Sequence, residues 1–157
     1  MTAAKAEPKA IREVTLTRVI AAPRERVFRA WTDPKHMAQW WGPKGFTNPV
    51  CEVDARPGGM IRIDMRAPDG VDYPMDGVFH EVIEPERLVF TSRAFAPDTN
   101  KTLIRALNTV TFAYEGGNTR LTVVARVMEV APEFAAAAAG MEEGWSQSLE
   151  RLQELVR

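Results

Sequence analysis

The sequence predicts an α+β fold in which a curved antiparallel sheet wraps around one long C-terminal helix. Alternating apolar and polar residues, separated by turn motifs, recur from 47 to 127 and are typical of paired strands. A single apolar stripe at three- or four-residue steps then runs from Pro132 to Arg157, as in an amphipathic helix of about 25 residues. Such a helix can cover the apolar face of the sheet, so residues 12–157 are expected to form one domain. The Ala-, Lys- and Pro-rich residues 1–11 are expected to form a flexible tail.

The N-terminal part is predicted to contain one strand and two short helices. Alternation from Val14 to Ile20 indicates the strand. A helix is expected to begin with Pro23 at its first position and to end at Asp33. Asp33 also caps a second helix, from Pro34 to about Trp40, which Gly42-Pro43 terminates.

About six further strands follow, each bounded by residues that favour turns. Glycine, proline, asparagine and aspartate gather at 57–59, 68–70, 84–86 and 115–118. The expected strands are 50–53, 60–66, 75–83, 87–93, 107–114 and 119–127.

The composition excludes several classes of protein. The chain has 157 residues, of which 45% are hydrophobic and 26% charged, and its net charge is −1. A chain without excess charge does not attract nucleic acid or anionic membranes. No run of about 18 apolar residues is present, and the N-terminal residues lack the hydrophobic core of a secretion signal. We therefore expect a cytoplasmic protein that neither binds nucleic acid nor inserts into a membrane.

Residues for the common catalytic and metal sites do not occur at the required spacings. Cys51 is the only cysteine, which fits a reducing compartment, and we interpret it as a half-buried strand residue. His36 and His80 are the only histidines, and neither stands in a metal-ligand motif. The serines lack the Gly-x-Ser-x-Gly context of a nucleophile. No catalytic residue, metal or cofactor is predicted.

The apolar residues that face inward can form a closed core, and at the wider end of the sheet they can instead line a ligand cavity. A sheet curved around one helix rarely closes completely, and methionine and aromatic side chains at its wider end adapt to many ligands. The run Ala135 to Gly140 is a thin helical segment that leaves volume, although it can instead bring the helix close to the sheet. The expected ligand-binding residues are Trp40, Phe46, Ile63, Met65, Asp76, His80, Phe90, Phe112, Phe134, Met141 and Trp145.

The orientation of the strand at 75–83 stays open, because Gly77 can mark a bulge. In one orientation Asp76 and His80 face the cavity and orient a polar group of the ligand. In the other orientation Glu81 faces inward instead.

The adjacent tryptophans are expected to separate at the cavity rim. We expect Trp40 to turn toward the cavity and Trp41 to pack against the first helix or the sheet edge. The segment Lys44 to Phe46, which follows Gly42-Pro43, is then expected to act as a gate.

Several stretches of this chain together resemble one known family. The stretch RVIAAPRERVFRAWTDP (18–34), QWWGP (39–43) and the closing GWSQSLERL (144–152) resemble the START-like, helix-grip (SRPBCC) superfamily. The branch is the one named for the C-terminal domain of the activator of the heat-shock protein 90 ATPase. The resemblance covers about residues 12–157. It implies a helix-grip fold, like that of the birch pollen allergen, with a hydrophobic cavity between the sheet and the long helix.

Members of this superfamily include lipid and hormone binders, aromatase or cyclase enzymes and chaperone partners, so the resemblance does not fix a reaction. We favour binding of a small hydrophobic or amphipathic molecule without catalysis. One alternative is a polyketide cyclase-like enzyme in which Asp76, His80 or Glu81 moves a proton. The other is a chaperone-interacting module, although residues 1–11 are too short to supply the N-terminal chaperone-binding domain of the eukaryotic activator. Homodimerisation through strand edges or exposed aromatic residues remains open.

Overall fold

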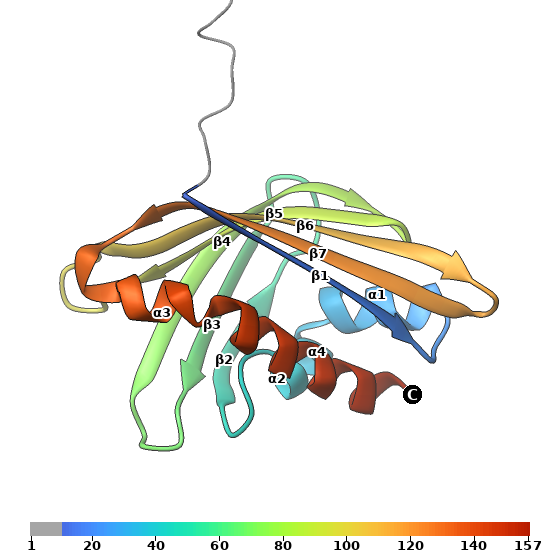
Figure 1. Cartoon of the computed structure of the whole chain (residues 1–157), viewed down its shortest axis with the longest axis horizontal. Helices are drawn as coiled ribbons and strands as arrows, with labels where there is room; N and C mark the ends of the chain where they lie inside the picture. The colour runs from blue at the N-terminus through green and yellow to red at the C-terminus, as the bar shows by residue number, and fades with distance from the viewer. Residues whose placement is uncertain (1–10) are drawn as a thin grey trace, which may run out of the picture.

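The computed structural model describes residues 11–157 and has the expected α+β architecture. Seven antiparallel strands form one sheet in the order β1-β7-β6-β5-β4-β3-β2. The sheet curves around the C-terminal helices, and α1 and α2 lie beside them on the same face (Figure 1). The strands are β1 (Arg12–Ile20), β2 (Thr47–Val53), β3 (Met60–Arg66), β4 (Asp72–Ile83), β5 (Arg87–Phe95), β6 (Thr102–Glu115) and β7 (Asn118–Val130). The helices are α1 (Arg24–Thr32), α2 (Pro34–Trp40), the 3-10 helix η2 (Pro132–Phe134), α3 (Ala135–Ala139) and α4 (Met141–Val156).

The N-terminal expectations hold with small changes of boundary. The flexible tail expected at 1–11 lies outside the described residues except for Ile11, whose backbone N–H donates to the carbonyl of Val127 at 2.8 Å. Pro23 is the residue before α1 rather than its first residue, because its ψ of 152° is extended. Asp33 caps α2 as expected, and its side chain accepts the backbone N–H of Lys35 at 2.8 Å.

The expected strands are all present, and most of them extend beyond the predicted ends. The strand from Met60 to Arg66 matches its prediction, and the hairpin between β6 and β7 lies where it was expected. Gly116 and Gly117 form its turn with φ of 59° and 89°, a conformation that glycine adopts without strain. Alternation therefore located the strands, whereas pairing with neighbouring strands set their length.

The C-terminal helix is interrupted, and the prediction of one continuous helix from Pro132 to Arg157 is wrong. The chain passes from η2 through α3 and bends at Gly140, whose φ and ψ are −88° and 4°. The N–H of Gly140 is shared between the carbonyls of Ala136 and Ala137 at 3.1 and 3.2 Å, a tightened last turn of α3. The apolar stripe continues across this bend, so the sequence pattern did not reveal it.

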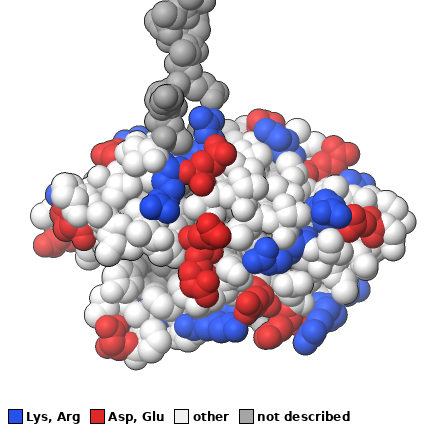
Figure 2. All heavy atoms as spheres, in the orientation of Figure 1, with Lys and Arg blue, Asp and Glu red and all other residues white. Residues whose placement is uncertain are grey.

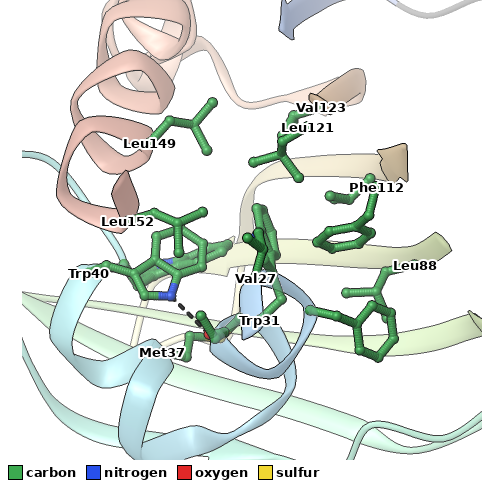
Figure 3. Close-up of a cluster of buried hydrophobic side chains, with 14 of the residues drawn as sticks. Val27, Trp31, Met37, Trp40, Leu88, Phe112, Leu121, Val123, Leu149 and Leu152 are labelled. Carbon is green, nitrogen blue, oxygen red and sulfur yellow. Dashed lines mark hydrogen bonds between the residues drawn. The ribbon is translucent and has the colours of Figure 1, made fainter. Parts of the chain in front are cut away.

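One end of the molecule is a densely packed core. Trp31 and Trp40 are fully buried, and their ring centroids lie 4.6 Å apart in an edge-to-face arrangement. Side chains of α1, α2, α4 and the sheet converge around them (Figure 3). The indole N–H of Trp40 donates to the carbonyl of Ala30 at 2.9 Å. Because this end is filled, open volume between sheet and helix lies at the other end, near α3.

Candidate ligand-binding site

A cavity of about 590 Å³ lies between the sheet and the helical segment α3–α4. Its volume is within the range of about 300–1,000 Å³ that is usual for small-molecule sites. The wall is mainly aromatic and methionine side chains from β3, β4, β5, the loop after α2, and the C-terminal helices. These residues are Trp41, Phe46, Met65, Tyr73, Met75, Phe95, Phe134, Met141 and Trp145.

The lining contains part of the predicted ligand-binding set. These residues lie on the loop after α2, on β3 and on the C-terminal segment, where the sheet and helix diverge. They are Phe46, Met65, Phe134, Met141 and Trp145. The ring of Trp145 also stacks on Trp31 with centroids 6.0 Å apart, so the cavity wall continues directly into the packed core.

Three predicted residues face the helix side of the sheet but belong to the core. Ile63, Phe90 and Phe112 are 0%, 1% and 2% exposed, and none of them lines the cavity. Phe112 packs edge-to-face on Phe28 of α1 at 5.1 Å. The expectation that they line the cavity is therefore corrected: inward orientation was right, but α1 and α2 fill the space above these positions.

The two polar candidates on β4 point away from the cavity. Met75 and Phe79 are buried, so the alternate residues Asp76 and His80 face outward, and His80 is exposed. Asp76 instead accepts two hydrogen bonds from the guanidinium of Arg93, both at 3.0 Å. Neither residue can orient a ligand in this cavity.

Glu81 also lies outside the cavity, and the cause is a bulge. The pairing of β4 with β5 shifts between Phe79 and Glu81, so the bulge lies there and not at Gly77. Glu81 is exposed and pairs with Arg87 at 3.2 Å. Gly77 has a different role, since a Cβ atom at this position would lie 1.9 Å from the carbonyl oxygen of Thr91 on β5.

The two adjacent tryptophans have exchanged their expected places. Trp40 is fully buried under α1, whereas Trp41 lines the cavity and meets Trp145 edge-to-face at 5.4 Å. Helix α2 ends at Trp40, and Trp41 has extended backbone angles of −63° and 134°. This change of backbone conformation directs the second ring toward the cavity, although the two rings stay in contact with centroids 5.6 Å apart.

Arg151 of α4 binds the main chain of residues 39–46, which we call the rim segment. Its guanidinium donates to the carbonyls of Gln39, Trp41, Gly42 and Pro43 at 3.0–3.1 Å. Burial lowers the pKa of Arg151, yet a guanidinium stays protonated at neutral pH. Sequence reasoning missed this contact, because Arg151 resembles any polar residue on the outer side of an amphipathic helix.

The rim segment is also tied down just beyond the Arg151 contacts. Lys44 pairs with Glu150 of α4 at 2.7 Å, and its backbone N–H donates to the side chain of Gln147 at 3.0 Å. The hydrogen bond with Glu150 raises the pKa of Lys44. The expected gate at Lys44 to Phe46 therefore begins with a residue that is fastened to α4.

A few polar side chains interrupt the apolar wall. Ser92 and Asn108 lie on neighbouring strands, and Ser148 lies on α4. Glu133 lies at the mouth and pairs with Lys101 at 2.7 Å. Sequence reasoning missed this set, although an asparagine between the inward-facing positions 106 and 110 was a readable signal of a polar group within the sheet's apolar face.

Comparison with known proteins identifies the family. The family described as Activator of Hsp90 ATPase homolog 1-like protein matches residues 21–157. The chain belongs to this family. No match was found among curated proteins.

Solved structures support the family's fold for this member. A protein from Chromobacterium violaceum is 33% identical, with a TM-score of 0.76, and the match covers 92% of this chain and 96% of that one. A protein from Nitrosomonas europaea is 28% identical, with a TM-score of 0.76 and coverage of 91% and 92%. A protein from Arthrobacter aurescens is 23% identical, covers 92% and 85%, and has a TM-score of 0.80, which supports the fold alone. The helix-grip fold is confirmed.

Among the described residues of this Hsp90 ATPase activator-like family member, few are candidates for catalysis or metal binding. Cys51 is half-buried on β2 as expected, and burial raises its pKa to about 11, with Glu52 adding to the effect. The thiol is therefore neutral and a weak nucleophile near pH 7. Within residues 11–157, no group of three or more His, Cys, Asp or Glu side chains could hold a metal ion. In the same part of the chain, no helix has the length and apolar character needed to cross a membrane.

Acidic and basic residues are nearly balanced in this protein. Figure 2 shows acidic and basic side chains interspersed on one face of the molecule, without a large patch of one sign. This distribution agrees with the net charge of −1. Among the described residues, Glu133 is the one charged residue in the cavity wall.

Proposed function

We propose that this protein binds a small, largely apolar molecule in the cavity between the sheet and α3–α4. The observation that carries the proposal is the cavity itself, about 590 Å³ in volume and walled by Trp41, Met65 and Trp145 beside a fully packed core. Apolar surface removed from water contributes about 25 cal/mol per Å². A ligand that covers these rings and thioethers therefore gains affinity mainly by burial.

The composition of the wall supports a ligand rather than further packing. Methionine side chains such as Met65 and Met141 adapt their shape, which suits a site that accepts an added molecule. The helical wall at Ala136 and Ala137 is thin, so the cavity owes part of its volume to small side chains. We place this activity in the reducing cytoplasm, in keeping with the single neutral thiol of Cys51.

The two alternative functions lack support from the site. The cyclase hypothesis depended on Asp76, His80 or Glu81, and none of them lines the cavity. The titratable residues that do line it are Tyr73 and Glu133, both near solvent. The chaperone link comes from the family's description rather than from a feature of this site.

Two alanine positions on α3 give a direct test of the cavity. Both alanines are exposed on the same short helix, but Ala137 lines the cavity and Ala139 does not. Ala137→Phe should fill the cavity and weaken binding about tenfold or more, since the ring occupies the ligand's volume, while Ala139→Phe should leave binding unchanged. Binding is measured by tryptophan fluorescence, because Trp41 and Trp145 line the cavity. The probes are fatty alcohols, sterols and flavonoids.

Native mass spectrometry of the freshly purified protein complements the titration by detecting a ligand that is carried through purification. Binding with equal affinity to wild type and Ala137→Phe would place the ligand elsewhere. The absence of any carried ligand, together with no fluorescence change for any probe, would refute the proposal.

A further inference from the structure

We propose, building on the function above, that the cavity selects an uncharged ligand that carries a hydroxyl group, through Asn108 of β6 and Ser92 of β5. Asn108 is 1% exposed, the least exposed side chain in the cavity wall. A polar side chain this deep in an apolar wall must find hydrogen-bond partners, because an unsatisfied buried group is costly. The hydrogen-bonding capacity that its protein partners leave unused therefore defines what the cavity can recognise.

The orientation of the Asn108 amide follows from its protein contacts. Its Nδ2 donates to the backbone carbonyl of Phe90 at 3.3 Å and to the Oγ of Ser92 at 2.9 Å. A carbonyl oxygen can only accept, so the nitrogen and not the oxygen of the amide must face Phe90. The Oδ1 of Asn108 is left as an acceptor, and within residues 11–157 the structure gives it no hydrogen bond.

Ser92 supplies the complementary donor. Its Oγ accepts the hydrogen bond from Asn108, and a hydroxyl that accepts still has its own proton to donate. Ser148, by contrast, already donates its proton to the carbonyl of Gly144 at 3.0 Å. The pair Asn108 and Ser92 thus offers one acceptor and one donor, which matches a hydroxyl group, since a hydroxyl both donates and accepts.

The charges of the wall disfavour an anionic ligand in this position. Within the described residues 11–157, no lysine or arginine lines the cavity, and Glu133 is the one charged residue that does. A carboxylate beside Asn108 would lose its hydration without gaining a cation. An uncharged alcohol or phenol avoids this cost.

A ligand without a donor would also bind less well. In the free protein, water can bond to Oδ1, and an apolar ligand that displaces this water leaves the acceptor without a partner. A ligand hydroxyl replaces the water's hydrogen bond. We expect this difference to be worth about five- to tenfold in affinity, the equivalent of about 1 kcal/mol.

A series of matched probes tests the proposal on the wild-type protein. The probes are 4-phenylphenol, 4-methoxybiphenyl, biphenyl and biphenyl-4-carboxylate, compared at pH 7, where a phenol is uncharged. They share one apolar frame and differ in the polar group. 4-Phenylphenol should bind about five- to tenfold more tightly than 4-methoxybiphenyl, which accepts but cannot donate to Oδ1, and more tightly than the carboxylate.

Three variants assign the preference to the two residues. Asn108→Leu and Ser92→Ala should each weaken 4-phenylphenol while leaving biphenyl binding the same or stronger. Thr109→Val is the matched control, because Thr109 adjoins Asn108 on β6 and faces the opposite side of the sheet. It should leave the whole series unchanged. The wild-type series decides the question without any variant, so poor folding of Asn108→Leu does not remove the test.

The outcomes separate this inference from the proposed function. If 4-methoxybiphenyl, biphenyl or the carboxylate binds wild type as tightly as 4-phenylphenol, the selection for a hydroxyl is wrong while ligand binding stands. If Asn108→Leu and Ser92→Ala keep the preference for 4-phenylphenol, the assignment to these residues is wrong. If no probe of this series binds and none of the broader set does, the proposed function fails together with this inference.

Discussion

At the scale of single residues, the adjacent tryptophans Trp40 and Trp41 have different roles. The Trp40 side chain lies in the core, and its indole N–H donates a hydrogen bond to the carbonyl of Ala30 near the end of α1. The last carbonyls of a helix lack partners within the helix, so this donor replaces a missing one. Trp41 faces the cavity, where its ring is available to a ligand. One tryptophan thus belongs to the core, and the next one forms part of the cavity wall.

Paired substitutions to phenylalanine should separate these tasks. Trp40→Phe should lower the free energy of unfolding by about 1–3 kcal/mol, because it leaves the Ala30 carbonyl unpaired and a void in the core. Trp41→Phe should cost less stability but should weaken ligand binding. Urea unfolding followed by circular dichroism measures the first effect, and titration measures the second. Equal stability losses in the two variants would contradict the division.

At the scale of elements, two glycines have opposite constraints. Gly77 of β4 faces β5 so closely that a Cβ atom would lie 1.9 Å from the Thr91 carbonyl oxygen. Gly140 lies between α3 and α4, where the nearest atoms to a Cβ are carbonyl oxygens at 3.7 Å, an ordinary contact. The sheet therefore requires glycine at position 77, whereas the space at position 140 also admits a Cβ atom.

Alanine substitutions at these two glycines should therefore diverge. Gly77→Ala should lower the free energy of unfolding by more than about 2 kcal/mol, since backbone must move to relieve the clash. Gly140→Ala should leave stability unchanged or raise it by up to about 1 kcal/mol, because alanine favours helix. Urea denaturation checks both values. If Gly140→Ala lowers the free energy of unfolding as much as Gly77→Ala does, the bend at residue 140 requires glycine, contrary to this prediction.

Elements were more predictable from the sequence than their contacts were. Alternation located the strands, and Asp33 located the start of α2, because these signals are local. The helix break at Gly140 was not predicted, because the apolar stripe continues across it with the same spacing. Of the residues predicted to bind a ligand, Met65 lies in the cavity wall, where sheet and helix diverge, whereas Phe112 lies in the core, because the position of α1 above it depends on tertiary packing.

At the scale of the whole molecule, packing is uneven. The end with Trp31 and Phe112 is filled by buried side chains, while the end with α3 contains the cavity. Strand β7 pairs on both sides, with β1 and β6, whereas β2 is an edge strand whose residues are mostly exposed. Local opening requires less free energy where fewer apolar contacts are lost. The cavity end should therefore open more readily than the core.

Hydrogen exchange followed by mass spectrometry should detect this difference. Amides of β7 should exchange slowest, near the limit set by global unfolding, and those of α3 and β2 should exchange faster through local opening. A saturating ligand should slow exchange in α3 and in residues 42–46 of the rim segment more than in β7. Uniform exchange across the chain, or protection by ligand confined to β7, would contradict this account.

The contacts of Arg151 have a consequence for how the cavity wall can be altered. In the rim segment its guanidinium donates to the backbone carbonyl oxygens of residues 39, 41, 42 and 43, and every amino acid has such an oxygen. The fastening of this segment is thus indifferent to the side chain at Trp41. A substitution at position 41 should therefore reshape the cavity wall while the main chain beneath it keeps its hydrogen bonds to Arg151 of α4.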